Sequence, residues 1–160
     1  MPADSPIFII GCGRSGTTLL RMMLDSHPRI SAGEETKFLT DLQPIVGEHW
    51  SLLSAYGFSR EWWLDRIRAF YGDFQAEYLA KRGKQRWAEK TPGYTFHLDF
   101  IAELFPDAQY VHVIRDGRDV ALSWEKLSQI RRLPGDPREL RLAKFEVRAD
   151  DQPEGRHCRC

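Results

Sequence analysis

Four short segments with strand-like patterning occur along the chain, at residues 7–10, 29–32, 86–90 and 109–114. Between and after them, apolar residues recur every three or four positions, which is the spacing of one face of a helix. Helices are expected over residues 19–24, 37–46, 59–84, 96–105 and 120–124. Strands that alternate with helices predict an α/β fold of three layers, with a central parallel β-sheet flanked by helices.

Two of the expected helices carry apolar side chains that should face the core. In the helix that Ser59 caps, they are Trp63, Ile67, Phe70, Phe74 and Tyr78. In the helix after the third strand, they are Phe96, Leu98, Ile101, Leu104 and Phe105. For the first of these helices, core packing is favoured over an aromatic ligand cage, and the second is expected to bury its apolar stripe.

The first strand leads into the loop Gly11-Cys12-Gly13-Arg14-Ser15-Gly16-Thr17-Thr18 and then into a helix. This is the layout of a phosphate-binding loop, in which glycines let backbone N–H groups point at an oxyanion. The N-terminus of the following helix adds positive charge. The alternative is a tight connection, but the arginine and the three hydroxyl side chains among these glycines favour an oxyanion site.

The loop differs at one position from that of a nucleotide triphosphatase. Thr17 stands where such an enzyme carries a lysine that reaches toward the terminal phosphates. Arg14 supplies a cation from a different side. A small-molecule or nucleotide kinase is therefore disfavoured, and magnesium-dependent turnover of adenosine triphosphate would be the observation that supports it.

Polar residues also follow the other three strands. Glu34 and Glu35 follow the second, Lys90 ends the third, and Arg115 follows the fourth. Because ligands bind at the carboxyl ends of parallel strands, we expect these residues to share one rim with the glycine loop. Taken singly, each is more typical of a solvated loop charge, and only the shared rim favours a site.

Arg115 and Ser123 suggest a second anion contact. They lie eight residues apart, one after a strand and one on the first turns of the next helix, so both could face a single phosphate. With the glycine loop, they imply a ligand that carries two separated phosphate groups. The alternative makes Arg115 an ordinary turn charge.

Composition excludes other classes of partner. The chain has 23 basic and 23 acidic side chains, so its net charge suggests neither nucleic acid nor an anionic membrane. No apolar run approaches the roughly 18 residues needed to span a bilayer, and the N-terminus lacks the basic region of a signal peptide, so a cytoplasmic protein is expected. Cys12, Cys158 and Cys160 form neither a disulfide framework nor a four-ligand zinc pattern.

With these motifs together, the chain resembles the sulfotransferases that use 3′-phosphoadenosine 5′-phosphosulfate (PAPS), a sulfated nucleotide with a second phosphate on its ribose. Residues 13–19 are similar to the family's 5′-phosphosulfate loop, and residues 113–123 are similar to its 3′-phosphate motif. Residues 14–18, 23–28 and 33–36 resemble the protein-tyrosine sulfotransferase branch and its bacterial relatives.

The resemblance implies sulfuryl transfer from PAPS to a hydroxyl or amine acceptor, without a metal. It implies that the donor is bound by Gly13, Arg14, Ser15, Gly16, Thr17, Thr18, Arg115 and Ser123. Of these, Arg14, Thr17 and Thr18 would hold the 5′-phosphosulfate, and Arg115 and Ser123 the 3′-phosphate. Glu35 would be the general base, and Lys90, with Arg14, would stabilise the charge of the leaving group.

The resemblance covers residues 6–124 and then fades. We expect the N-terminal part of a sulfotransferase domain at residues 1–145 and a polar, disordered tail at residues 146–160. Because the family's members are longer, a C-terminally truncated chain is expected. The main alternative function is then an inactive fragment that binds the nucleotide without transfer. The acceptor is left open among peptide tyrosine, sugar, lipid and small phenol, and a homo-oligomer could supply missing surface.

Overall fold

The computed structural model describes residues 5–131. The chain divides into two compact units, residues 1–120 and 121–160. The first unit holds the sheet and its covering helices, and helix α6 (Gly117–Arg131) begins in it and continues into the second. The tail expected at 146–160, with Cys158 and Cys160, lies outside the described residues.

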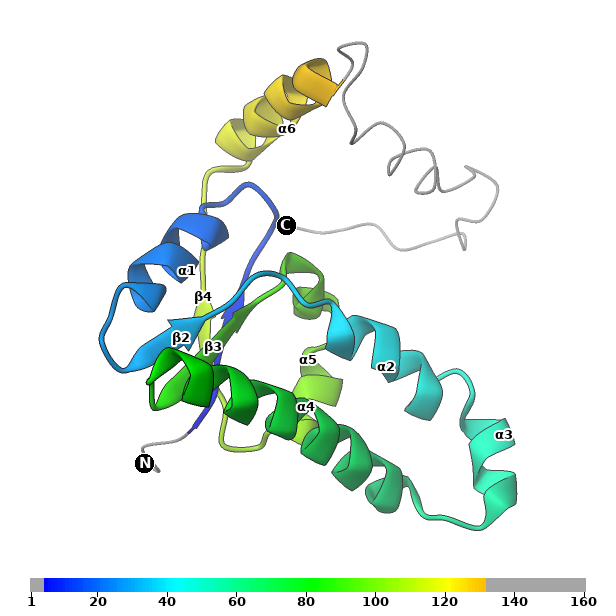
Figure 1. Cartoon of the computed structure of the whole chain (residues 1–160). Helices are drawn as coiled ribbons and strands as arrows, with labels where there is room; N and C mark the ends of the chain where they lie inside the picture. Colours follow the sequence, from blue (N-terminus) through cyan, green and yellow to red (C-terminus); the bar gives the residue numbers. More distant parts are fainter. Residues whose placement is uncertain (1–4, 132–160) are drawn as a thin grey trace, which may run out of the picture. The chain divides into compact units, whose positions relative to one another are not determined.

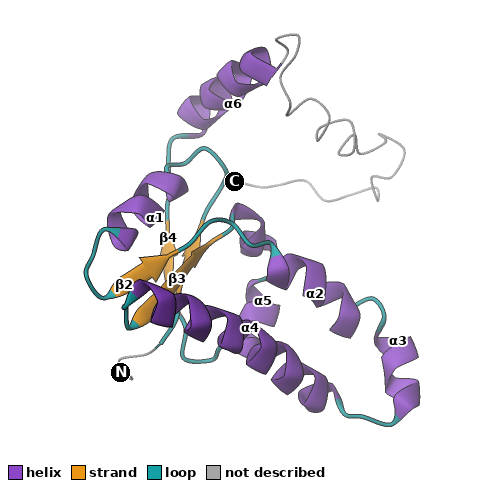
Figure 2. Ribbon diagram, viewed as in Figure 1, coloured by secondary structure: helices purple, strands orange, loops and turns teal. Residues whose placement is uncertain are grey.

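The sheet is parallel throughout, as predicted (Figure 2). Its strands are β1 (Ile7–Ile10), β2 (Ile30–Ala32), β3 (Arg86–Lys90) and β4 (Gln109–His112), in the order β2-β3-β1-β4. The connection after β1 leads to β2 on one side, whereas the connection after β3 leads to β4 on the other side of β1. Such a reversal opens a crevice at the carboxyl end of the central strand, where open α/β sheets bind ligands.

Helices cover both faces of this sheet (Figure 1). Their bounds in the first unit are α1 Thr17–Asp25, α2 Phe38–Val46, α3 Trp50–Leu53, α4 Arg60–Arg82 and α5 Leu98–Leu104, with 3₁₀ turns η1 Ser54–Tyr56 and η2 Pro92–Phe96. Helix α1 packs on one face, where Leu24 meets Ile7, Ala32 and Ala88. Helices α2, α4 and α5 pack on the other face, so the predicted three layers are present.

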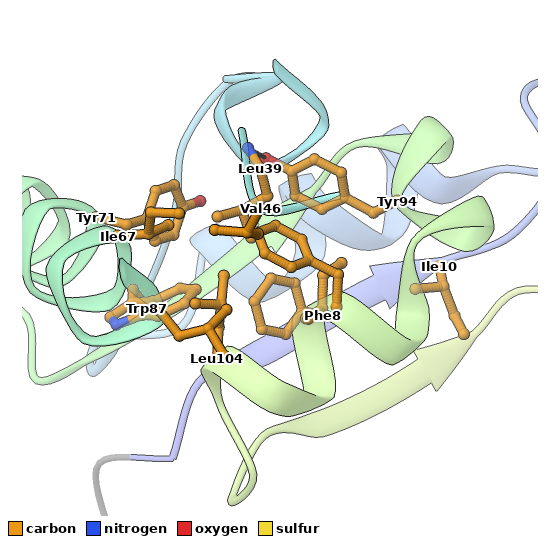
Figure 3. Packing of buried hydrophobic residues seen from close by; sticks show 12 residues of the cluster. Phe8, Ile10, Leu39, Val46, Ile67, Tyr71, Trp87, Tyr94 and Leu104 are labelled. Atoms are coloured by element: carbon orange, nitrogen blue, oxygen red, sulfur yellow. Dashed lines mark hydrogen bonds between the residues drawn. The ribbon is translucent and has the colours of Figure 1, made fainter. Parts of the chain in front are cut away.

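The larger core lies between the sheet and α2, α4 and α5 (Figure 3). Phe8 on β1 is its centre, with ring centroids 5.5 Å from Trp87 on β3 and 5.7 Å from Phe105 after α5. Tyr71 on α4 lies 5.6 Å from Trp87 by the same measure. These rings bury large apolar areas and fix α4 and α5 against the strands.

Successive side chains of a strand point to opposite faces of the sheet, so neighbouring residues of β3 face different layers. Ala88 packs on the α1 side, and Trp87 packs in the larger core. Glu89 therefore points to the α4 side, in register with Phe8, and Lys90 points to the α1 side, in register with Ile9.

The predicted apolar face of α4 is partly wrong. Ser59 caps this helix through its hydroxyl, which accepts from the Trp62 N–H at 3.2 Å, and Gly83 ends it, as expected. Its buried positions, however, are Leu64, Ile67, Tyr71 and Gln75. Phe70 is 54% exposed because it lies on the outer flank, where its ring meets Phe38.

The helix expected at 96–105 is also shorter than predicted. Phe96 belongs to η2 and is 78% exposed, and α5 starts at Leu98. Ile101 and Leu104 are buried as predicted, and Phe105 packs against the same core. The fourth strand ends at His112, two residues earlier than expected, and β4 is the edge of the described sheet.

The end of β1 is closely approached by the segment after β4. The Val113 N–H donates to the Ile10 carbonyl at 2.9 Å, and a Cβ at Gly11 would lie 2.5 Å from the Val113 carbonyl oxygen. Gly11 also has φ +142°, a conformation that side chains rarely adopt. Only glycine fits this position.

Gly11→Ala should therefore lower the free energy of unfolding by about 1–3 kcal/mol or more, since backbone strain and overlap add. Gly72→Ala is the matched control, because Gly72 lies inside α4 with nothing within 4 Å of an added Cβ. It should raise stability by about 0.5–1 kcal/mol. Urea unfolding followed by circular dichroism measures both, and equal stability of Gly11→Ala and the parent would contradict the close approach.

Candidate functional site

The glycine loop after β1 has the backbone of an anion site. The Ser15 N–H donates to the Cys12 carbonyl at 3.2 Å, which closes a turn. Gly16 then caps α1 in the left-handed region, at φ +103°, and leaves the first turn of the helix without a side-chain cap. Arg14 is also left-handed, at φ +72°, which the sequence did not predict. The loop thus brings backbone N–H groups and the positive end of α1 together.

The hydroxyl side chains of this loop differ in accessibility. Ser15 and Thr17 are buried, whereas Thr18 is exposed. Gly13 is half-buried and Arg14 is exposed. The hydroxyl of Thr18 therefore reaches the rim. Thr17 is buried and contributes the first residue of α1.

Lys90 joins this loop to the end of β2. Its side chain is only 3% exposed, and its ammonium donates to the Thr18 hydroxyl at 3.2 Å and forms a short ion pair with the Glu35 carboxylate. Glu35 itself is 39% exposed, so the pair opens to solvent on one side. Residues that follow β1 and β2 thus meet the last residue of β3, which confirms the predicted convergence.

The two adjacent glutamates have different partners. Arg21, on α1, donates to the Ala32 carbonyl at 3.0 Å, to the Gly33 carbonyl at 3.3 Å and to the Glu34 carboxylate at 2.8 Å. Glu34 is therefore an exposed partner of α1, and Glu35 alone faces Lys90. The candidate site contains one carboxylate of this pair.

The segment after β4 also reaches the loop. The Arg115 guanidinium donates to the Arg14 carbonyl at 3.3 Å and lies 3.5 Å from the Asp119 carboxylate. A cation thus lies beside the glycine loop, as expected. Ser123 lies on α6 in the second unit, so a phosphate contact shared by Arg115 and Ser123 stays a prediction.

Sequence reasoning missed a buried polar cluster on the other face of β3. Glu89 is 1% exposed, and its Oε1 accepts from the Thr91 hydroxyl at 2.8 Å and from the Thr36 hydroxyl at 3.3 Å. The Tyr94 hydroxyl lies 3.2 Å from the Thr36 hydroxyl and accepts from the Leu39 N–H. A carboxylate next to a lysine inside a strand was the available signal.

Three further findings concern the described part of the chain. Within residues 5–131, no group of three or more His, Cys, Asp or Glu side chains is placed to hold a metal ion. No helix in that range is long and apolar enough to cross a membrane. Cys12 is a free, exposed thiol in the glycine loop.

Burial raises the pKa of Glu89 above its ordinary 4.5, and the hydrogen bonds from Thr91 and Thr36 oppose that rise. A raised pKa means that the folded state holds the proton more tightly than the unfolded chain does. The stability contributed by this proton is fully present below pH 4.5 and is lost as pH rises through the raised pKa.

The parent should therefore lose stability relative to Glu89→Gln as pH rises from about 4.5, and the difference should become constant above the raised pKa of Glu89. Thermal unfolding of both proteins between pH 4 and 8 measures this difference, since all other titrating groups are common to both. A parent that gains stability relative to Glu89→Gln over this range would contradict the assignment.

Comparison with known proteins adds the family. The model of the sulfotransferase family matches residues 6–133. Protein-tyrosine sulfotransferase A of Caenorhabditis elegans is 35% identical over 120 residues, which are 70% of this chain and 30% of that protein. Protein-tyrosine sulfotransferase 1 of Mus musculus is 36% identical, over 72% of this chain and 32% of that protein. Nodulation protein NoeE of Sinorhizobium fredii is 32% identical, over 72% and 30%.

Among solved structures, sulfotransferase STF9 from Mycobacterium avium superimposes with a TM-score of 0.46 and 18% identity, covering 88% of this chain and 48% of that one. The chain spans about a third of the length of the curated relatives that it matches. The family model, in contrast, covers most of the chain and every element from β1 to α6. The chain belongs to the sulfotransferase family.

Proposed function

We propose that the rim formed by the glycine loop, Glu35, Lys90 and Arg115 is the donor-binding and catalytic side of a PAPS-dependent sulfotransferase site. One observation carries the proposal: the nearly buried Lys90 ammonium bridges Glu35 and Thr18. A lysine so placed contacts the start of α1, where an anion would bind, and a carboxylate that could accept a proton. A lysine without a structural or functional partner is normally exposed to solvent.

The loop residues fit a nucleotide donor. Gly13 and Gly16 would present backbone N–H groups to the 5′-phosphosulfate, together with the hydroxyl of Thr18 and the first turn at Thr17. Ser15 would shape the loop through its N–H bond to the Cys12 carbonyl. Arg14 would add a cation at that group, and Arg115 would bind the 3′-phosphate, for which the sequence motif also predicts Ser123. Support comes from the left-handed Gly16 at the start of α1 and from Arg115 beside the loop.

Lys90 would act on the leaving group. In sulfuryl transfer, a bond forms between the acceptor oxygen and sulfur, and the bond between sulfur and the bridging oxygen of the 5′-phosphate breaks. The leaving 3′-phosphoadenosine 5′-phosphate (PAP) takes the electron pair, so negative charge grows on that oxygen. A buried ammonium stabilises such charge strongly, because little water screens it.

Glu35 would act on the acceptor as the general base. It would take the proton that the hydroxyl loses as the oxygen attacks sulfur. Its carboxylate is partly exposed, which gives an acceptor access, and it stands against Lys90. A phenol, with a pKa near 10, gives up its proton more readily than an alkyl hydroxyl does. The tyrosine-modifying relatives make a peptide tyrosine the first acceptor to test.

The binding half of this proposal predicts that the chain binds PAP and that Arg14→Ala and Arg115→Ala each weaken binding about 10- to 100-fold, the value of one charge-assisted hydrogen bond. Arg66→Ala is the matched control, because Arg66 lies over the Trp62 ring on α4. Isothermal titration calorimetry on the folded chain measures all four proteins. No binding by a folded parent, or an equal loss in Arg66→Ala, would refute the donor site.

The catalytic half predicts a separation of binding from transfer. Glu35→Gln should bind PAP at least as tightly as the parent, because a carboxylate beside the anion is removed and Lys90 loses its competing partner. Transfer from sulfur-labelled PAPS to a tyrosine peptide should fall on the order of 10²–10⁴-fold, the usual effect of a general base. A parent that binds PAP and transfers nothing to peptide, sugar or phenol acceptors would identify a nucleotide-binding fragment instead.

A further inference from the structure

Strand β3 ends in two adjacent charged residues that are both buried. Glu89 is 1% exposed and Lys90 is 3% exposed, and they point to opposite faces of the sheet. Burying two charges or polar groups side by side is costly unless each has hydrogen-bond partners. Thr18 binds Lys90 and Thr91 binds Glu89. The remaining partner of each comes from one short loop, residues 33–37 after β2.

Consecutive residues of that loop bind consecutive residues of the strand. Glu35 pairs with Lys90 on the α1 side. Thr36 donates to Glu89 on the α4 side, through its hydroxyl at 3.3 Å and its backbone N–H at 3.4 Å. The loop therefore holds the end of β3 from both faces. Glu35 is next to Thr36 in the loop, and Lys90 is next to Glu89 in the strand.

Anchors on both sides of Glu35 hold the loop. Before it, Arg21 of α1 binds the Ala32 and Gly33 carbonyls. After it, the Thr36 hydroxyl lies within hydrogen-bond distance of the Tyr94 hydroxyl as well as of Glu89. Since Tyr94 is also buried and accepts from the Leu39 N–H, the second anchor continues into α2. Glu35 lies between the two anchors and is exposed.

We infer that Glu89 is a positioning residue, which holds the loop through Thr36 and so fixes the Glu35 carboxylate against the Lys90 ammonium. The inference rests on the proposed function for the meaning of that pair, but the geometry it predicts exists without any substrate. Glu89 lies on the opposite face from Lys90 and acts only through Thr36 and the strand. Without an acceptor at position 89, the Thr36 N–H and hydroxyl lose their shared partner. The loop then stays bound to Arg21 at Ala32 and Gly33, but the part that carries Glu35 becomes more mobile.

The test compares two replacements of similar size. Glu89→Gln keeps an acceptor oxygen, and Glu89→Leu removes it. The readout is the rate at which Lys90 is acetylated by an N-hydroxysuccinimide ester, measured by mass spectrometry on the whole chain. Lys84, which is 11% exposed and paired with Asp25, is the internal control.

Glu89→Leu should raise the acetylation rate of Lys90 about three- to tenfold, the population shift expected from losing one or two hydrogen bonds, and should leave Lys84 unchanged. Glu89→Gln should stay close to the parent. Thr36→Val, which removes the hydroxyl but keeps the backbone N–H bond to Glu89, should raise the rate in the same direction by a smaller factor. The double variant should add little to Glu89→Leu, and Thr36→Ser should keep the protection of the parent. Unchanged Lys90 labelling in folded Glu89→Leu and Thr36→Val would overturn the inference, and so would a parallel rise at Lys84, which marks general loosening.

This labelling needs neither nucleotide nor acceptor, so it tests the positioning role of Glu89 independently of the proposed function. If PAP does not bind but Lys90 labelling responds as described, the donor site fails and the positioning role stands. If transfer is observed, Glu89→Leu should lower kcat several-fold while the KM for PAPS stays near that of the parent, because Glu89 touches no donor-binding residue of the loop. A rise in KM with kcat unchanged would overturn the role.

Discussion

The buried ammonium of Lys90 is the constraint on which the rim depends. A lysine that is 3% exposed is tolerated only where other groups replace its water shell. Its partners come from two elements far apart in the sequence, Thr18 at the start of α1 and Glu35 after β2. The ends of β1, β2 and β3 are thus tied to one charge, and the position of each limits the other two.

The parallel sheet makes this arrangement possible. Small residues at Ala32 and Ala88 let α1 lie close on one face, which brings Thr18 within reach of Lys90. The other face carries the aromatic core around Phe8, so Glu89 is enclosed by side chains and needs Thr36 and Thr91 as donors. One loop after β2 serves both faces because strand residues alternate in direction.

Local patterns were enough to predict the strands, the glycine loop and the shared rim. The four strand segments and the Gly-rich turn are short-range signals, and parallel pairing of the strands follows from the helices between them. The buried face of α4 could not be predicted, because its aromatic residues satisfy helical spacing on two adjacent faces. Packing of Tyr71 against Trp87 chose between them, and Phe70 was left on the flank.

The site shows the same division. Glu35 and Lys90 could be expected at the rim because each ends or follows a strand, and the family resemblance favoured Glu35 over Glu34. The physical reason for that choice is a tertiary contact, the bond from Arg21 that holds Glu34. The left-handed Arg14 and the buried Glu89 had no pattern that favoured them over ordinary loop and strand positions. Pairwise contacts between distant segments decide such residues, and no window of sequence contains both partners.

The source of the cation changes the chemistry that the loop can perform. A triphosphatase lysine lies on the loop itself, and here Thr17 occupies that position while Lys90 approaches from β3. Because Lys90 lies on β3, it can also pair with Glu35, the carboxylate that follows β2. A lysine on the loop itself would not make that pair. Under the proposed function, an anionic donor at the loop competes with Glu35 for the same ammonium. Binding the donor then releases the carboxylate to act as a base, so the base is freed when the anion site of the loop is filled.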